Sequence, residues 1–167
     1  LTTQNGNNNA YCQDTVMSWV NWELSRHQRD FEETFAHLTK LRRENPVLRP
    51  KTFGDFNEAN EDHDMIRWFN SQGDIMGEEN WHDSECRTIQ RYSERLELDG
   101  SRSAILLLIH GAEKVQEVTL PSQDGVLRYE LLWNSAFDQP NEEIETVLPG
   151  AKTLVSGTSI QVFRCNF

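Results

Sequence analysis

The apolar residues follow a period of two over most of the sequence beyond Pro50, and this pattern constrains the fold more than any other feature. Segments such as "TIQRYSERLELD", "AILLLIHG", "LRYELLW" and "TSIQVFRCNF" alternate apolar with polar residues or are rich in β-branched and aromatic ones. Turn sequences such as "DGS", "PSQDG" and "LPGAK" separate them. About six to eight short strands, with no helix between them, predict a mainly β fold: an antiparallel β-sandwich over residues 51–167.

Individual segments predict the place of several strands. "AILLLI" is apolar on both faces, so it is predicted to be a central strand. "MIRWFN" and "GDIM" predict a short hairpin around Ser71–Gly73. In the segment 127–133, four side chains are predicted to point to one side of the sheet: Leu127, Tyr129, Leu131 and Trp133.

Residues 29–45 follow a helical period instead. Apolar side chains recur there at three- and four-residue steps, on one side of a helix: Phe31, Phe35, Leu38 and Leu41. Asp30 followed by Glu33 predicts a capping box at the start, and Pro46 predicts the end. A helix with one apolar side must lie against another surface.

The charge balance excludes two classes of partner. The 27 acidic residues exceed the 16 basic ones, which gives a net charge of −11. Nucleic acids and anionic membrane surfaces are bound through Lys and Arg, so neither is an expected partner. A neutral ligand such as a sugar is compatible with this charge. The three cysteines, Cys12, Cys86 and Cys165, are widely spaced and predict free thiols in a reducing cytoplasm.

No motif in the sequence assigns a catalytic or metal-binding residue. Neither a Cys/His metal spacing nor a nucleotide-binding fingerprint is present, so no metal and no cofactor is predicted. Glu78 and Glu79 beside Trp81 favour a solvated turn rather than a catalytic carboxylate pair. The "WHDSEC" segment favours a structural role, because neighbouring positions on a helix cannot all face one ion.

The segment "NGNNNAY" has the composition of a turn and also of a sugar contact. Asparagine amides both donate and accept hydrogen bonds, and an aromatic ring can cover the apolar side of a pyranose. Asn7, Asn8, Asn9 and Tyr11 are therefore candidate substrate-binding residues, with a plain polar turn as the alternative.

Several longer segments resemble one enzyme family. "GNNNAYCQD", "SWVNWEL", "LTKLRRENPVLRP", "DMIRWFNSQGDIMGEENWHD" and "LLLIHGAEKVQEVTLP" are similar to segments of bacterial glycogen debranching enzymes, the isoamylase-type branch of the α-amylase superfamily. The resemblance covers essentially the whole sequence. It implies that residues 1–50 are a helical remnant, the end of a catalytic (β/α)8 barrel, and that residues 51–167 are the C-terminal antiparallel β-sandwich.

The resemblance also implies a function. Members of the family hydrolyse α-1,6-glucosidic branch linkages in glycogen or limit dextrin, with retention and without a redox cofactor. Their three catalytic carboxylates would all precede Leu1, and no Asp or Glu of this sequence matches those motifs. We therefore expect a C-terminal fragment that is inactive alone and serves a structural role. Asn7, Asn8, Asn9 and Tyr11 resemble the loop that lines the glucan cleft.

The remaining expectations concern the apolar side of the helix, two tryptophans and an alternative function. The apolar side of the helix at 29–45 can pack on the sandwich, pair with a second copy in a homodimer, or stay exposed. Trp19 and Trp22 are expected to pack in a core. The alternative function is an α-glucan-binding module that holds the ligand through exposed aromatic residues such as Trp81 or Trp133.

Overall fold

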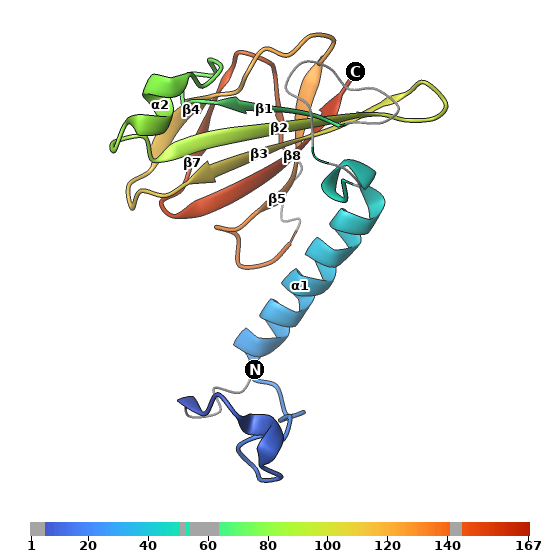
Figure 1. Cartoon of the computed structure of the whole chain (residues 1–167), viewed down its shortest axis with the longest axis vertical. Coiled ribbons are helices and arrows are strands. Elements are labelled where there is room, and N and C mark those ends of the chain that lie inside the picture. The colour runs from blue at the N-terminus through green and yellow to red at the C-terminus, as the bar shows by residue number, and fades with distance from the viewer. Residues whose placement is uncertain (1–5, 51–52, 54–63, 141–144) are drawn as a thin grey trace.

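The computed structural model describes residues 6–50, 53, 64–140 and 145–167. A body of β-strands carries a long helix, α1, which leads away from it to the N-terminal segment (Figure 1). The helical elements are η2 (Ala10–Cys12), α1 (Arg26–Glu44), η3 (Pro46–Leu48) and α2 (Glu78–His82). The strands are β1 (Met65–Phe69), β2 (Thr88–Leu96), β3 (Arg102–His110), β4 (Gln116–Thr119), β5 (Arg128–Asn134), β6 (Thr146–Val147), β7 (Lys152–Val155) and β8 (Ser159–Asn166).

All strand pairs of the described residues are antiparallel, as the sequence predicts. One sheet has the order β1-β2-β3-β8-β5-β6, and a second sheet consists of β4 and β7. The main core lies between the two sheets and includes Tyr92, Leu106, Phe163, Val118 and Val155. The mainly β antiparallel fold class is thus confirmed.

The prediction of a central strand for "AILLLI" is confirmed, because β3 pairs with β2 on one side and β8 on the other. Its side chains alternate between two cores. Leu106 and Leu108 belong to the core beneath the β4–β7 sheet, whereas Ile105 packs on the opposite face against η3 and the end of α1. Burial on both sides explains the continuous apolar run.

The prediction for the side chains of 127–133 is wrong at both ends. Leu127 is exposed, and a β-bulge between Leu131 and Trp133 shifts the register of β5 against β8. Leu131 pairs with Phe163, but Trp133 pairs with Val162 on the opposite face. An extra residue in one strand reverses the direction of every later side chain, and alternation in the sequence does not reveal it.

Helix α1 begins earlier than the sequence predicts, and its cap is different. Ser25 is the N-cap, its hydroxyl accepts the Gln28 N–H, and the Gln28 side chain accepts the Ser25 N–H at 2.9 Å. The Asp30–Glu33 capping box is therefore wrong, because both residues lie inside the helix. The end before Pro46 is confirmed: Asn45 caps it and donates its side-chain amide to the Leu41 carbonyl.

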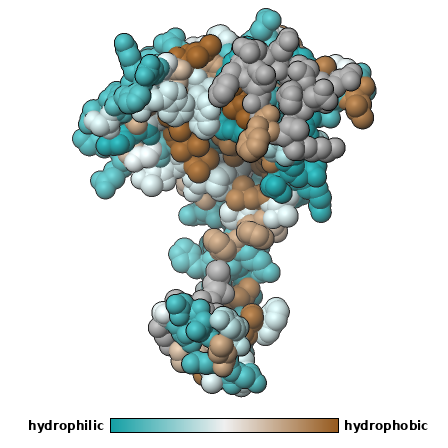
Figure 2. All heavy atoms as spheres, in the orientation of Figure 1, coloured by the Kyte–Doolittle hydropathy of each residue, from teal (hydrophilic) through white to brown (hydrophobic). Residues whose placement is uncertain are grey.

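Only the C-terminal end of α1 packs on the sheet. Leu41 and Val47 are buried against Ile105 and Val162, whereas Phe31 is 55% and Phe35 is 66% exposed. Figure 2 shows apolar side chains both along α1 and on the face of the sheet turned to the viewer. His37, one turn before Leu41, also lies 3.4 Å from the Leu132 carbonyl of β5. Of the expected outcomes for this helix, packing on the sandwich therefore holds for its C-terminal part, and exposure holds for Phe31 and Phe35.

The segment before α1 does not form a core. Trp19 and Trp22, which the sequence predicts to be buried, are exposed. The segment lies at the far end of α1, away from the β-strands (Figure 1). The indole N–H of Trp19 donates to Asp14 at 2.6 Å instead. The division between residues 1–50 and 51–167 remains a prediction.

Candidate functional site

The four predicted substrate-binding residues lie together in the exposed segment before α1. The side-chain amide of Asn7 donates to Gln13 at 3.0 Å, and its carbonyl oxygen accepts the Asn9 N–H at 2.9 Å. Asn8 and Tyr11 are exposed. Local hydrogen bonds of this kind are typical of an asparagine-rich turn. Their role in binding a glucan remains a prediction.

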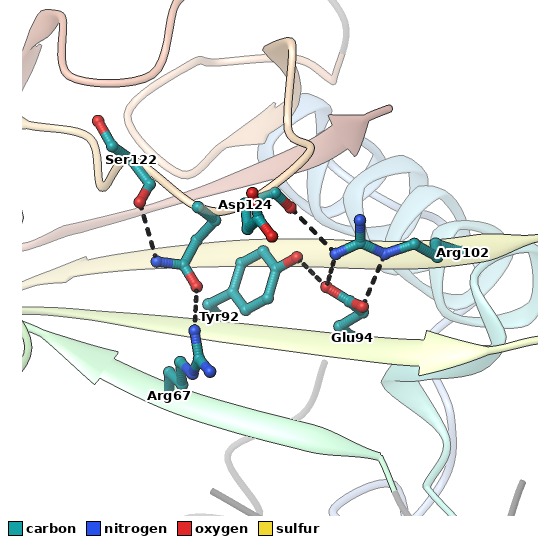
Figure 3. A network of polar contacts seen from close by, with 7 residues as sticks. Arg67, Tyr92, Glu94, Arg102, Ser122 and Asp124 are labelled. Atoms are coloured by element: carbon teal, nitrogen blue, oxygen red, sulfur yellow. Dashed lines mark hydrogen bonds and ion pairs between the residues drawn. The ribbon is translucent and has the colours of Figure 1, made fainter. Parts of the chain in front are cut away.

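The buried carboxylate of Glu94 forms an ion pair and a hydrogen bond inside the sandwich. Arg102 donates to it through two nitrogens, at 2.8 Å each, from the neighbouring strand β3. The Tyr92 hydroxyl donates to the same carboxylate (Figure 3). Burial, and then the hydrogen bond to Glu94, raise the pKa of Tyr92 above its ordinary value, so the phenol stays protonated.

This network continues into the loop that follows β4. Arg102 also donates to the Asp124 carbonyl at 3.1 Å, and its guanidinium lies 4.2 Å from the centre of the Phe167 ring. Arg67 of β1 donates to Gln123 of the same loop at 3.1 Å (Figure 3). The contacts join β1, β2, β3, the loop and the C-terminal residue, so the network holds one end of the sandwich together.

Asp64 is the other buried carboxylate among the residues that the structure describes. Arg95 binds both of its oxygens, at 2.7 and 2.8 Å. Retaining glycoside hydrolysis needs two carboxyl groups about 5–5.5 Å apart, one of them protonated as the acid. An arginine binds both oxygens of each buried carboxylate, Arg95 on Asp64 and Arg102 on Glu94. Both groups are therefore held in ion pairs within the sandwich.

Metal ligands are also lacking in the described part of the chain. No group of three or more His, Cys, Asp or Glu side chains there could hold an ion. His82 and Asp83 of the "WHDSEC" segment are exposed, and the His82 ring is bonded to the Glu78 carbonyl at 2.8 Å. Among the described helices, none has both the length and the apolar character to cross a membrane.

The two tryptophans considered for glucan binding lie in different surroundings. Trp133 is half-buried and packs in the cluster of Ile105 and Val162. Trp81 of α2 is 51% exposed and stands on Trp68 of β1, with ring centres 5.6 Å apart and ring planes at 77°. The two rings line a hollow of about 290 Å³ together with Arg67, Ile75 and Met76.

Sequence reasoning singled out Trp81 but missed Trp68 and the helix that joins them. Neighbouring residues of a strand point to opposite faces, so the burial of Phe69 in the core places Trp68 on the other face. The five residues of α2 are too few to show a helical period. Its local signal is Asn80, whose side chain accepts the Gly77 N–H at 2.9 Å and so caps the first turn.

The described residues thus form an antiparallel β-domain with an exposed aromatic pair and a projecting helix. No family model matches the chain. It is 32% identical over 119 residues to the glycogen debranching enzyme of Cronobacter sakazakii, which is 71% of this chain and 16% of that protein. It is also 28% identical over 160 residues to the isoamylase of a Flavobacterium species, which is 94% of this chain and 20% of that protein.

The chain therefore belongs to the family of glycogen debranching enzymes and isoamylases. It spans between 12% and 20% of the length of the curated relatives that it matches.

Proposed function

We propose that this chain belongs to a cytoplasmic enzyme that hydrolyses α-1,6-glucosidic branch linkages in glycogen or limit dextrin, and that the chain serves a structural role there. Its similarity to glycogen debranching enzymes and to an isoamylase supports the substrate class. Its three unpaired cysteines support a reducing compartment. In this proposal, α1 is the last helix of the catalytic barrel and the strands form the β-domain that supports it.

The exposed side of α1 is the observation that carries the structural role. Phe31 and Phe35 lie four residues apart on one side of the helix and are more than half exposed. Burying one such side chain stabilises a protein by about 1.5–3 kcal/mol. The last turn of the same helix is already anchored on the sheet through Leu41. Helix α1 is thus built to connect the β-domain to a further apolar surface, which the barrel supplies.

A chimera tests this function. The segment of the Cronobacter sakazakii enzyme that matches this chain is replaced by the corresponding residues of this chain, and release of reducing ends from a branched limit dextrin is measured. We expect the chimera to hydrolyse the dextrin and the 167-residue chain alone to release nothing. Phe31→Ser with Phe35→Ser should lower both the melting temperature and the activity of the chimera.

Leu98→Ser is the matched control, because Leu98 is a fully exposed apolar residue in the turn between β2 and β3. It should leave the chimera unchanged. Hydrolysis of the dextrin by the chain alone would overturn the structural role. A chimera that folds but does not act on the dextrin would overturn the assignment of the substrate.

A further inference from the structure

The indole ring of Trp81 is half exposed to solvent and packs on the ring of Trp68. Its neighbour Trp68 is held in β1, and the Arg91 guanidinium lies 5.9 Å from the centre of the Trp68 ring. Burial lowers the pKa of Arg91 from its ordinary value, against the opposing effect of Asp64. Because Trp68 is flanked by Arg91 and by Trp81, the exposed ring of the pair is that of Trp81.

The backbone around the pair is fixed by hydrogen bonds. The Met76 N–H donates to the Trp68 carbonyl at 2.9 Å, and Phe69 forms a bridge with Ile75. Asn80 closes the first turn of α2 onto Gly77. The position of Trp81 is therefore set before any ligand arrives, which reduces the entropy lost on binding.

The size and the lining of the hollow indicate a small, partly apolar ligand. A volume of about 290 Å³ lies at the lower end of small-ligand sites. A protein partner would need a contact of about 800 Å² on each side. Trp68, Trp81 and Ile75 provide apolar surface, and Arg67, whose guanidinium donates to Gln123, adds a polar side chain to the lining. Anionic ligands are disfavoured by the net charge of −11.

We propose that the Trp68–Trp81 pair is a binding site for the pyranose rings of an α-1,4-linked glucan chain. The C–H groups on one side of a glucose ring carry partial positive charge, which complements the negative face of the Trp81 ring. The glucose hydroxyls at the edge of the ring reach the polar part of the lining. The pyranose class follows from this geometry, and the α-linked glucan rests on the proposed function.

Titration of the 167-residue chain with maltoheptaose, followed by NMR of the five indole N–H groups, tests this site. We expect the Trp68 and Trp81 signals to shift with saturation and those of Trp19, Trp22 and Trp133 to stay in place. Trp81→Ala should weaken binding at least tenfold. Trp81→Phe keeps an aromatic ring and should retain binding within a few-fold. Trp22→Ala removes an exposed indole outside the hollow and should change nothing.

The outcomes separate the site from the proposed function. Unshifted Trp68 and Trp81 signals at saturating maltoheptaose, or shifts confined to other indoles, would overturn the site. Binding of cellohexaose in place of maltoheptaose would keep a pyranose site but overturn the α-glucan. Activity of the chimera is measured separately, so the proposed function can be supported even if maltoheptaose does not bind at Trp68 and Trp81. The NMR spectrum of each variant shows whether it folds. If Trp81→Ala does not fold, retained binding by Trp81→Phe together with shifts of the Trp68 signal tests the site instead.

Discussion

At the scale of single residues, the least predictable feature is a carboxylate inside the sandwich. Glu94 is buried two positions after Tyr92 on the same strand, where alternation places an apolar side chain. Arg102 compensates for its charge from the neighbouring strand. The pairing depends on the register of β2 against β3, in which Glu94 lies opposite Ala104. A sequence pattern predicts which face a residue takes, but not which partner a neighbouring strand brings.

Removing the charge of Glu94 should destabilise the fold. Glu94→Gln retains the volume and one acceptor, but it leaves the partly exposed Arg102 without its carboxylate partner. Hydrogen bonds to charged groups contribute about 1.5–3 kcal/mol each, and Arg102 is about one-third exposed, which screens part of its charge. We expect a loss of roughly 2 kcal/mol in the free energy of unfolding, measured by urea denaturation.

Glu117→Gln is the control for this prediction. Glu117 also pairs with a cation, Lys152 at 2.6 Å, but both side chains are more than half exposed. Exposed pairs contribute about 0–1 kcal/mol, so this change should be close to neutral. Equal effects of the two substitutions would contradict the importance of the buried network.

At the scale of elements, prediction succeeded where a pattern repeats and failed where one residue decides. Strands β2, β3, β5 and β8 and the body of α1 repeat their pattern often enough to be recognised in the sequence. The cap of α1 depends on a single serine, and Asp30 with Glu33 offers an equally plausible signal. Helix α2 has one turn and no period. Local competition between such signals is decided by the packing of the surrounding chain.

The exposed side of α1 should cause the chain to associate with itself. In the absence of another apolar surface, Phe31 and Phe35 of two copies can bury each other. We expect a monomer–dimer equilibrium in sedimentation equilibrium runs of the 167-residue chain. Phe31→Ser with Phe35→Ser should weaken the dimer at least tenfold, because each buried Phe contributes about 1.5–3 kcal/mol.

Leu98→Ser again serves for comparison, since it removes exposed apolar area in the turn between β2 and β3, outside α1, and should leave the equilibrium unaltered. A chain that stays monomeric at every concentration would refute association through α1. A dimer that persists in the double variant would place the contact elsewhere.

At the scale of the whole molecule, the core formed by the described residues contains three groups that must stay protonated. Burial raises the pKa of Tyr92, of Tyr129 and of Cys165 above their ordinary values. In the unfolded chain, a thiol ionises near pH 8.5 and a phenol near pH 10. The stabilisation from these groups is therefore complete below those values and decreases as the pH rises above them, because the unfolded state then loses protons first.

The free energy of unfolding should consequently fall at alkaline pH, by up to about 1.4 kcal/mol per pH unit for each group. Urea denaturation between pH 7 and pH 11, under reducing conditions, measures the slope. Tyr129→Phe loses the hydrogen bond to the Pro121 carbonyl at all pH values but should flatten the slope above pH 10. Tyr11→Phe, at an exposed position, should leave the slope unchanged. An unaltered slope in Tyr129→Phe would contradict this account.

The order of the strands lies beyond what the pattern can predict. β3 pairs with β8, which follows it by about fifty residues, although β4, β5, β6 and β7 come between them in the chain. The candidate site is different, because Trp68 and Trp81 are close in sequence and meet through a hairpin and one helical turn. Alternation along β1 places Trp68 on the face opposite Phe69, but it does not predict the angle between the rings of Trp68 and Trp81.

The β-bulge at Leu132 determines the face of the sheet on which Trp133 lies. With Leu132 as the additional residue, Trp133 lies beside Val162 and helps to seat η3 and the end of α1. Deletion of Leu132 would remove the bulge but leave Trp133 opposite Val162, on the same face as before. A strand of unchanged length without the bulge would instead place Trp133 opposite Gln161, on the face already filled by Phe163, and would remove an aromatic support of the helix. In relatives, loss of the bulge at unchanged length should therefore accompany a changed attachment of the helix, even where every strand is retained.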